Sequence, residues 1–296
     1  MAKIGFIGVG HMGGPMVLNL LKHNHSVTIF DISKEALKPL QKEGARVASS
    51  PLELARSQDF IFTSLQTGDQ VKHLCEGSQG IFSVLSPQTI FIDCSSIDIH
   101  QAHQLHDSAR KAHLHMLDAP VSGGVAGATA GTLTFMVGGE KEVLEKAKPI
   151  LKCLGSRIIH TGPGGSGQAA KICNNLLLAI SMIGVCEAMA LAEKLHLSTD
   201  VFFDVASHSS GQCWSLSQYC PVPGPVPSAP SNRDYEPGFT GHMMLKDLTL
   251  SQNAAQHVKL LTPLGHAATQ LYHRWVDKGE GQKDFSGIIE LIRTLK

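Results

Sequence analysis

GFIGVGHMGGPM, residues 5–16, carries three glycines in the spacing Gly8-x-Gly10-x-x-Gly13. The apolar run that leads into them predicts a strand, and residues 12–23 have the apolar spacing of a helix. Glycines at such a junction either form a simple tight turn or let a phosphate approach the backbone. The strand before them and the helix after them favour the phosphate, because a helix N-terminus offers free N–H groups and the positive end of the helix dipole.

The next predicted strand, residues 27–31 (VTIFD), ends in Asp31, which follows the first glycine of the motif by 23 residues. A carboxylate at this place accepts hydrogen bonds from the adenine ribose of a dinucleotide. It would repel a 2′-phosphate, and the nearest base along the chain is Lys34. We therefore expect a Rossmann-type site that binds NAD rather than NADP. The residues expected to contact the cofactor in this region are Gly8, Gly10, His11, Met12, Gly13 and Asp31.

Strand and helix patterns continue to alternate up to residue 160. Further strands are expected at 46–48, 60–64, 89–94, 115–118, 132–138 and 157–160, with helices at 34–43, 51–57, 68–74, 99–112 and 142–154. The strands are apolar runs without clean alternation, which is typical of strands covered on both faces. The α/β half of the chain is therefore predicted to form a doubly wound parallel sheet.

A glycine-rich break at residues 162–167 ends this alternation, and a long apolar helix is expected after it at 168–195. Later helices are expected at 199–207, 245–257, 262–278 and 285–295, with a loop containing five prolines at 218–232. We therefore expect two domains joined by the long helix. They are an NAD-binding Rossmann domain at 1–163 and an all-α domain for substrate binding and oligomerisation at 164–296.

The composition excludes several classes of partner. Lys+Arg and Asp+Glu both number 25, so no net charge attracts nucleic acid or an anionic membrane, and we expect neither as a partner. The most apolar run, residues 176–192, contains Ser181 and Glu187, which favours a buried helix over a membrane span. The sixteen histidines include three at helical spacing, residues 100, 103 and 106, without cysteine or carboxylate ligands at metal spacing, so we expect no metal site.

The seven cysteines are scattered and form no C-x-x-C pair, which is typical of a reducing compartment. The first strand begins at Lys3 with no signal-peptide pattern before it. We therefore expect the cytoplasm of a bacterium or, for a processed eukaryotic form, the mitochondrial matrix.

Two later stretches carry chemistry. Residues 118–124 (DAPVSGG) follow a predicted strand, and strand ends are where open α/β sheets bind ligands. The hydroxyl of Ser122 and the unhindered N–H groups of Gly123 and Gly124 suit a carboxylate, although a plain turn would have the same sequence.

The second stretch, residues 167–175 (GQAAKICNN), places Lys171 and Asn175 on one helix face. A partly buried lysine near a helix start has its pKa lowered by burial and by the helix dipole, which suits a general acid/base for alcohol–carbonyl interconversion. The alternative is a lysine whose apolar stem packs while its amine reaches water.

The separated motifs together resemble the β-hydroxyacid dehydrogenase family over essentially the whole chain. They are the glycine stretch, residues 118–124, 131–139 (GTLTFMVGG), 167–175, 209–214 (SSGQCW), 220–224 (CPVPG) and 245–250 (LKDLTL). The SSGQCW stretch and the proline-rich loop are most similar to the branch that oxidises 3-hydroxyisobutyrate to methylmalonate semialdehyde with NAD, a step of valine breakdown.

The resemblance implies a role for each of several residues. Lys171 would be the catalytic acid/base. Substrate would be held or its pocket shaped by Ser122, Gly123, Gly124, Asn175, Trp214, Tyr219 and Asp247. The cofactor would also be lined by Leu65, Gln66, Gln70, Ser96 and Lys246. The resemblance further implies a small hydroxy-carboxylic acid as substrate and a homodimer or homotetramer.

Two rival functions remain open at this point. One is a related enzyme acting on L-serine, 3-hydroxypropionate, or tartronate or succinic semialdehyde, because one methyl group changes binding by only about 1–3 kcal/mol. The other is a dinucleotide-binding module without catalysis, for which loss of the lysine would be the sign. Lys171 is present.

Overall fold

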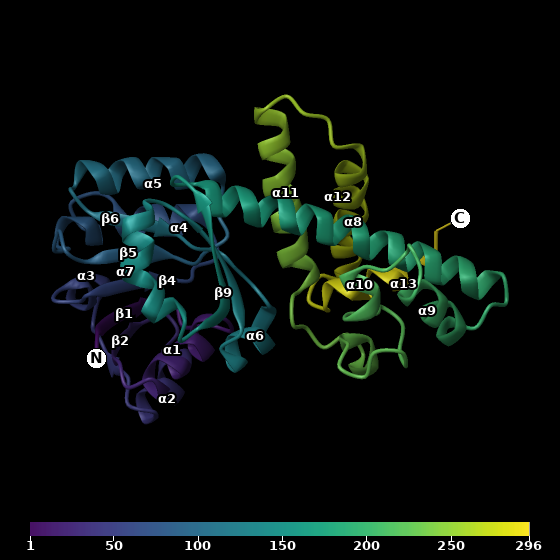
Figure 1. Ribbon diagram of the computed structural model, residues 1–296, viewed down its shortest axis with the longest axis horizontal. Helices are drawn as coiled ribbons and strands as arrows, with labels where there is room; N and C mark the ends of the chain where they lie inside the picture. Colours follow the sequence, from purple (N-terminus) through teal and green to yellow (C-terminus); the bar gives the residue numbers. More distant parts are fainter. Residues whose placement is uncertain (296) are drawn as a thin grey trace. The chain divides into compact units, whose positions relative to one another are not determined.

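The computed structural model describes residues 1–295, and the chain divides into two compact units, Met1–Lys171 and a second that begins at Ile172 (Figure 1). The helices in chain order are α1 (Gly13–Lys22), α2 (Lys34–Lys42), α3 (Pro51–Ala55), α4 (Gly68–Cys75), α5 (Ile99–Lys111), α6 (Gly124–Ala130), α7 (Lys141–Leu151), α8 (Ser166–Lys194), α9 (Thr199–Ser207), α10 (Trp214–Ser217), α11 (Gly241–His257), α12 (Pro263–Trp275) and α13 (Ile288–Ile292). The first residues of α8 belong to the first unit, whereas the domain boundary expected at 163/164 assigns them to the helical half.

The first unit is built on one sheet, in which nine strands are described. They are β1 (Lys3–Ile7), β2 (Ser26–Phe30), β3 (Arg46–Val47), β4 (Phe60–Thr63), β5 (Ile90–Asp93), β6 (His115–Asp118), β7 (Val121–Ser122), β8 (Leu133–Gly138) and β9 (Gly155–Gly162). Their order is β3-β2-β1-β4-β5-β6-β8-β7, with β9 beside β8. The predicted fold, a doubly wound α/β sheet followed by a helical part, is confirmed.

The strands from β3 to β6 are all parallel, and the pairing changes beyond β6. β8 runs antiparallel to β6, β7 runs antiparallel to β8, and β9 is parallel to β8. The physical reason is the connection: a parallel return needs a crossover of a dozen or more residues, whereas β7 and β8 are joined through the seven-residue α6. The sheet is therefore parallel from β3 to β6, as the sequence predicts, and turns antiparallel where β8 pairs with β6 and β7.

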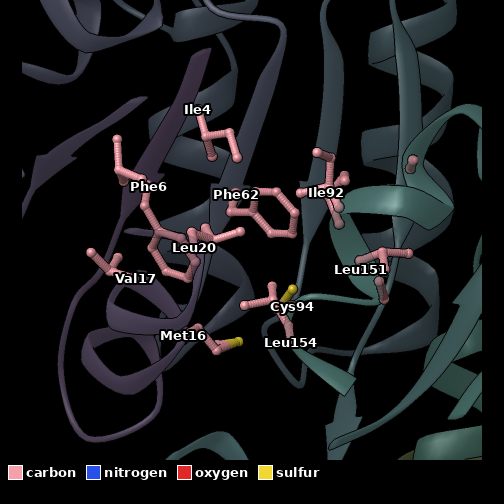
Figure 2. Packing of buried hydrophobic residues seen from close by; sticks show 14 of the residues in the cluster. Ile4, Phe6, Met16, Val17, Leu20, Phe62, Ile92, Cys94, Leu151 and Leu154 are labelled. Atoms are coloured by element: carbon pink, nitrogen blue, oxygen red, sulfur yellow. The ribbon is translucent and has the colours of Figure 1, made fainter. Parts of the chain in front are cut away.

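Alternate residues of the central strands pack into two separate apolar cores. Phe6, Phe62 and Ile92 pack with Met16, Val17 and Leu20 of α1 and with α7 on one face, as Figure 2 shows. Ile7, Ile61 and Phe91 pack on the other face against α3, α4 and α5. Covered faces on both sides explain why the strands are apolar runs rather than alternating ones.

The second unit has its own core. The long helix α8 contributes Met182, Cys186 and Met189 to it, and these pack with Tyr272 and Trp275 of α12. By length and composition α8 is also long and apolar enough to cross a membrane. Its sequence alone therefore does not distinguish a membrane-spanning helix from the core helix of a folded domain. The contacts of Met182, Cys186 and Met189 with the core of the second unit explain why that face of α8 is apolar.

Several elements differ from those expected. α11 begins at Gly241 rather than residue 245, and the helix expected at 262–278 ends at Trp275, beyond which Gly279 adopts a φ of 87°. The final helix is a 3-10 turn at Phe285–Gly287 followed by the short α13. The short elements β7, α6 and α10 were not expected from the sequence.

Candidate active site

The glycine loop lies where the strand order reverses, since β1 has β2 on one side and β4 on the other. In open α/β sheets, ligands bind at this point, beyond the carboxyl ends of the strands. Gly8 follows β1 with a φ of 87°, and a Cβ atom there would overlap the Ser64 carbonyl oxygen at the end of β4. Only glycine fits both the backbone conformation and this approach of the two loops.

The other two glycines of the motif have different surroundings. A Cβ atom on Gly13 would overlap the Gly8 carbonyl oxygen, so glycine lets α1 start directly against the loop. A Cβ atom on Gly10 would meet no atom within 4 Å, so the loop backbone there is open to a ligand. Among the described residues, no side chain caps the first turn of α1. Gly14 N donates to the Gly10 carbonyl at 2.9 Å and Pro15 has no N–H, so the Gly13 N–H is the group of this turn that we expect to meet phosphate oxygens. His11 is exposed and Met12 is half-buried beside this turn.

Asp31 follows β2 and is bonded to the glycine loop. Its Oδ2 accepts a hydrogen bond from Val9 N at 2.8 Å, and its Oδ1 accepts one from Ser33 N at 2.8 Å. A carboxylate has about four acceptor positions, so Asp31 keeps acceptors for the hydroxyls of a ribose. This arrangement fits the adenosine half of a dinucleotide.

The loops after β4 and β5 are held together next to the glycine loop. Leu65 N donates to Ser95 Oγ at 2.9 Å. Gln70 Oε1 accepts from Gln66 N at 3.1 Å and from Thr67 N at 3.2 Å, in the capping box of α4. The carboxamide oxygen of Gln70 thus shapes the loop that carries Leu65 and Gln66.

Sequence reasoning gave no role to Gln168, a fully buried residue in the first turn of α8. Its Nε2 donates to the Ser95 carbonyl at 2.7 Å, and its Oε1 accepts from Ile97 N at 3.1 Å. The backbone on both sides of Ser96, one of the expected cofactor residues, is thereby fixed to α8. A buried amide at the start of an apolar helix was the signal that could have revealed it.

Ser122, Gly123 and Gly124 form the turn between β7 and α6. Ser122 pairs with Thr134 of β8, which sets the start of the turn. Gly123 and Gly124 have φ values of 131° and 62°, both in the region that favours glycine. The direction of their N–H groups is therefore set by a backbone conformation that residues other than glycine rarely adopt.

Lys171 lies next to this turn. It is 8% exposed, and its Nζ donates a hydrogen bond to the Val121 carbonyl oxygen at 2.9 Å. Val121 directly precedes Ser122 in the chain. The structure thus brings together, within the first unit, the lysine and the serine–glycine turn that the sequence singled out separately.

Asp93, at the end of β5, is a further buried carboxyl. Its Oδ1 accepts from Thr63 Oγ1 at 2.8 Å and from Ser95 N at 3.0 Å, while its Oδ2 has no hydrogen-bond partner among the described residues. Burial raises the pKa of Asp93 to about 6, against the lowering effect of these bonds.

The remaining expected site residues lie in the second unit. Asn175 is buried and its Nδ2 donates to Asp247 Oδ2 at 2.5 Å. Lys246, next to Asp247 on α11, is half-buried. Trp214 is half exposed and stacks on Tyr219 with ring centroids 4.9 Å apart. The Tyr219 hydroxyl donates to the buried Asp284 at 2.9 Å, and burial raises the pKa of Tyr219.

Metal ligands are not grouped in this structure. Within residues 1–295, no cluster of three or more His, Cys, Asp or Glu side chains is placed to hold a metal ion, and the seven cysteines are free thiols.

Two family models match the chain in succession. Residues 3–162 match the NAD binding domain of 6-phosphogluconate dehydrogenase. Residues 165–292 match the model described as the NAD-binding region of NADP-dependent 3-hydroxyisobutyrate dehydrogenase. Together they cover nearly the whole chain.

Individual proteins are similar over the same length. The NAD-dependent L-serine dehydrogenase of Pseudomonas aeruginosa is 44% identical over 292 residues, which are 99% of this chain and 98% of the relative. The mitochondrial 3-hydroxyisobutyrate dehydrogenase of Homo sapiens is 42% identical over 290 residues, 98% of this chain and 86% of the relative. A solved structure of Mycobacterium tuberculosis 3-hydroxyisobutyrate dehydrogenase with L-serine has a TM-score of 0.94 and 41% identity, covering 99% of this chain and 100% of that one.

Proposed function

This chain belongs to the β-hydroxyacid dehydrogenase family of NAD(P)-dependent oxidoreductases, and from that premise we propose that it oxidises 3-hydroxyisobutyrate to methylmalonate semialdehyde. The observation that carries the proposal is the hydrogen bond from Lys171 Nζ to the Val121 carbonyl, because it fixes the lysine beside the Ser122-Gly123-Gly124 turn. A β-hydroxyacid has a carboxylate at one end and a hydroxyl at the other. The turn suits the carboxylate, and the amine beside it suits the hydroxyl.

In the proposed reaction the substrate carboxylate accepts hydrogen bonds from the Ser122 hydroxyl and from the N–H groups of Gly123 and Gly124. The substrate hydroxyl then faces Lys171. A neutral amine can donate one hydrogen to the Val121 carbonyl and still accept a proton through its lone pair. Lys171 thus takes the hydroxyl proton as the alcohol becomes an aldehyde, and returns it in the reverse direction.

The dinucleotide, when bound, supplies the hydride acceptor. The residues proposed to hold it in the first unit are Gly8, Gly10, His11, Met12, Gly13, Asp31, Leu65, Gln66, Gln70 and Ser96. The Asp31 carboxylate supports NAD as the preferred form, because it would lie against a 2′-phosphate and repel it.

Further site residues are proposed within the second unit. Asn175 follows Lys171 by one turn of α8, so we assign its amide to the substrate hydroxyl and to the orientation of the lysine. Asp247 holds Asn175 in turn. We assign Lys246 to the cofactor, and Trp214 and Tyr219 to the walls of the substrate pocket. Because the Tyr219 hydroxyl is bonded to Asp284, its ring face rather than its hydroxyl is assigned to that wall.

L-serine is the second candidate substrate, favoured by the name of the Pseudomonas aeruginosa relative and by the ligand of the Mycobacterium tuberculosis structure. Serine and 3-hydroxyisobutyrate share a primary alcohol β to a carboxylate and differ in an ammonium or methyl group on the carbon between them. Both therefore fit the same lysine chemistry, and the choice rests on the groups around that carbon.

The test is the ratio of kcat/KM values for (S)-3-hydroxyisobutyrate, L-serine and 3-hydroxypropionate at one saturating concentration of NAD. We expect the first compound to exceed the third by about 10-fold or more, because burial of one methyl group contributes about 1–3 kcal/mol. A higher kcat/KM for L-serine would overturn the substrate assignment and leave the lysine chemistry in place.

We further propose a homodimer or homotetramer in a reducing compartment, either the bacterial cytoplasm or the mitochondrial matrix. Exposed apolar side chains on the second unit support the oligomer, and the seven free thiols support the compartment.

A further inference from the structure

Asp118, at the end of β6, is completely buried and bonded to the start of α8. Its Oδ1 accepts from Gly165 N at 2.8 Å and its Oδ2 accepts from Gln168 N at 3.0 Å. These N–H groups lie before and within the first helical turn, where no backbone acceptor is available. A strand residue far away in sequence therefore caps the helix that carries Lys171.

His106 of α5 is a further partner of the Asp118 carboxylate. Its Nε2 lies 2.8 Å from Asp118 Oδ1, and its side chain is 11% exposed. Because the Asp118 carboxyl oxygens already accept from two backbone N–H groups, Nε2 is assigned as the donor in this contact. The carboxylate is thereby bonded to two backbone N–H groups and one imidazole.

The backbone around this pair is built from glycine. A Cβ atom on Gly138 or Gly167 would press against the Asp118 carboxylate, and one on Gly164 would press against the His106 ring. The carboxylate and the ring thus contact the main chain directly. Such close packing leaves few alternative rotamers to either side chain.

The position of this pair links it to the proposed catalytic group. Asp118 precedes Val121 by three residues, and Gln168, which it holds, precedes Lys171 by three residues. The hydrogen bond from Lys171 Nζ to the Val121 carbonyl joins the same two chain segments a second time, three residues further along each of them. We infer that Asp118 and His106 are positioning residues that set where the Lys171 amine meets the substrate hydroxyl.

This inference rests on the proposed function, because it acts through Lys171. Loosening the cap lets the first turn of α8 shift relative to the turn at Ser122. A displacement of about 1 Å of a proton-transfer group can lower the rate by about 100-fold. Substrate and cofactor are bound mainly by other groups, so the loss falls on kcat rather than on KM.

The experiment compares His106→Leu, which removes the donor, with His106→Gln, whose amide reaches the place of Nε2. His100→Leu is the matched control, because it is an exposed histidine in the first turn of the same helix α5 and its Nε2 lies 3.0 Å from Gln104 Nε2. The readouts are kcat and KM for the β-hydroxyacid that the wild type oxidises best. Asp118→Asn is a second variant, in which the carboxylate charge is lost and the shape is kept.

We expect His106→Leu to lower kcat by about 10-fold or more with KM within about 3-fold, and His106→Gln to restore kcat to within about 3-fold of the wild type. The kcat of the His100→Leu control should stay within about 2-fold of the wild-type value. Asp118→Asn should lower kcat more than His106→Leu does, because its amide nitrogen would face a backbone N–H donor in place of a carboxylate oxygen.

A double-mutant cycle separates positioning from general structure. In a Lys171→Ala background, His106→Leu should change the residual rate by less than about 2-fold, because its effect passes through the lysine. A His106→Leu enzyme with wild-type kcat, beside an inactive Lys171→Ala enzyme, would overturn this inference alone. A fully active Lys171→Ala enzyme would overturn the proposed function itself.

Discussion

Asp93 shows how a buried carboxyl costs stability at neutral pH. Burial raises its pKa to about 6, and its Oδ2 has no hydrogen-bond partner in residues 1–295. A carboxyl whose pKa is raised in the folded state stabilises the fold at low pH, and this contribution is lost as the pH rises from 3.8 to about 6.

We therefore predict a pH-dependent difference between the wild type and Asp93→Asn. The free energy of unfolding of the wild type, relative to that of the variant, should fall by about 1 kcal/mol between about pH 5 and about pH 7.5. Urea denaturation of both proteins at the two pH values measures it. An unchanged difference would mean that Asp93 does not titrate in this range.

Asp31 should decide between the two forms of the cofactor. Its replacement by serine removes the charge that opposes a 2′-phosphate and the acceptor that holds Val9 N. We predict that Asp31→Ser lowers the ratio of kcat/KM for NAD to that for NADP by at least about 10-fold, since each 1.4 kcal/mol of preference is a factor of 10.

The control for this prediction is Glu35→Ser, which changes the same charge in the first turn of α2. Glu35 is exposed and pairs with Lys38, outside the glycine loop. An equal change of cofactor preference in both variants would mean that net charge, and not contact with the ribose, sets the preference.

At the scale of elements, Gly13 allows the start of α1 to pack directly against the glycine loop that follows β1. A Cβ atom on Gly13 would overlap the Gly8 carbonyl oxygen, which is backbone and cannot rotate away. We predict that Gly13→Ala lowers the free energy of unfolding by about 1–3 kcal/mol. It should also weaken NAD binding, and thermal unfolding together with titration of NADH fluorescence measures both effects.

Gly184→Ala in α8 is the matched control, because a Cβ atom there meets nothing within 4 Å. That substitution should be neutral or should stabilise the protein by up to about 1 kcal/mol. If Gly13→Ala behaves in the same way, the close approach of helix and loop has no energetic consequence.

The same elements show what the sequence can predict. The strand, glycines, helix and acid of the first dinucleotide-binding segment are contiguous, and each is specified by residues within a few positions of it. β1, β4 and β5 were predicted because strands covered on both faces need continuous apolar runs.

Elements that depend on distant contacts were not predictable. α6 (GVAGATA) has little apolar periodicity, and its Ala128 carbonyl accepts a hydrogen bond at 2.7 Å from Asn19 of α1, which lies 109 residues away. The antiparallel β8 and the contact between Asp118 and His106 likewise join segments whose proximity only the folded chain reveals. Lys171 was identified from its helix, whereas its partner Val121 was not.

At the scale of the whole molecule, apolar side chains remain on the surface of the second unit. Leu261 is 89% exposed, and Leu264, Val201 and Val205 are exposed as well. They belong to α9 and to the region around the start of α12, and large apolar side chains left exposed are often covered by another subunit. We predict a mass of two or four times 31.7 kDa by light scattering coupled to gel filtration.

Leu261→Asp should lower the fraction of oligomer, because a charge in an apolar interface loses its hydration. Ile32→Asp in the first unit is the control, since Ile32 is as exposed as Leu261 and lies outside the helical part. A wild-type mass of 31.7 kDa would contradict the proposed oligomer.

Lys171 is the residue on which the proposed oxidation of a β-hydroxyacid depends most, because it is assigned as the acid/base. The direct measurement is the rate of NADH formation from (S)-3-hydroxyisobutyrate or L-serine at saturating NAD, for the wild type and for Lys171→Ala, with NAD affinity and unfolding temperature as controls. We predict turnover by the wild type and a loss of about 100-fold to 10,000-fold in the variant, with NAD affinity unchanged. A folded Lys171→Ala enzyme with a rate within about 3-fold of the wild type would contradict the account.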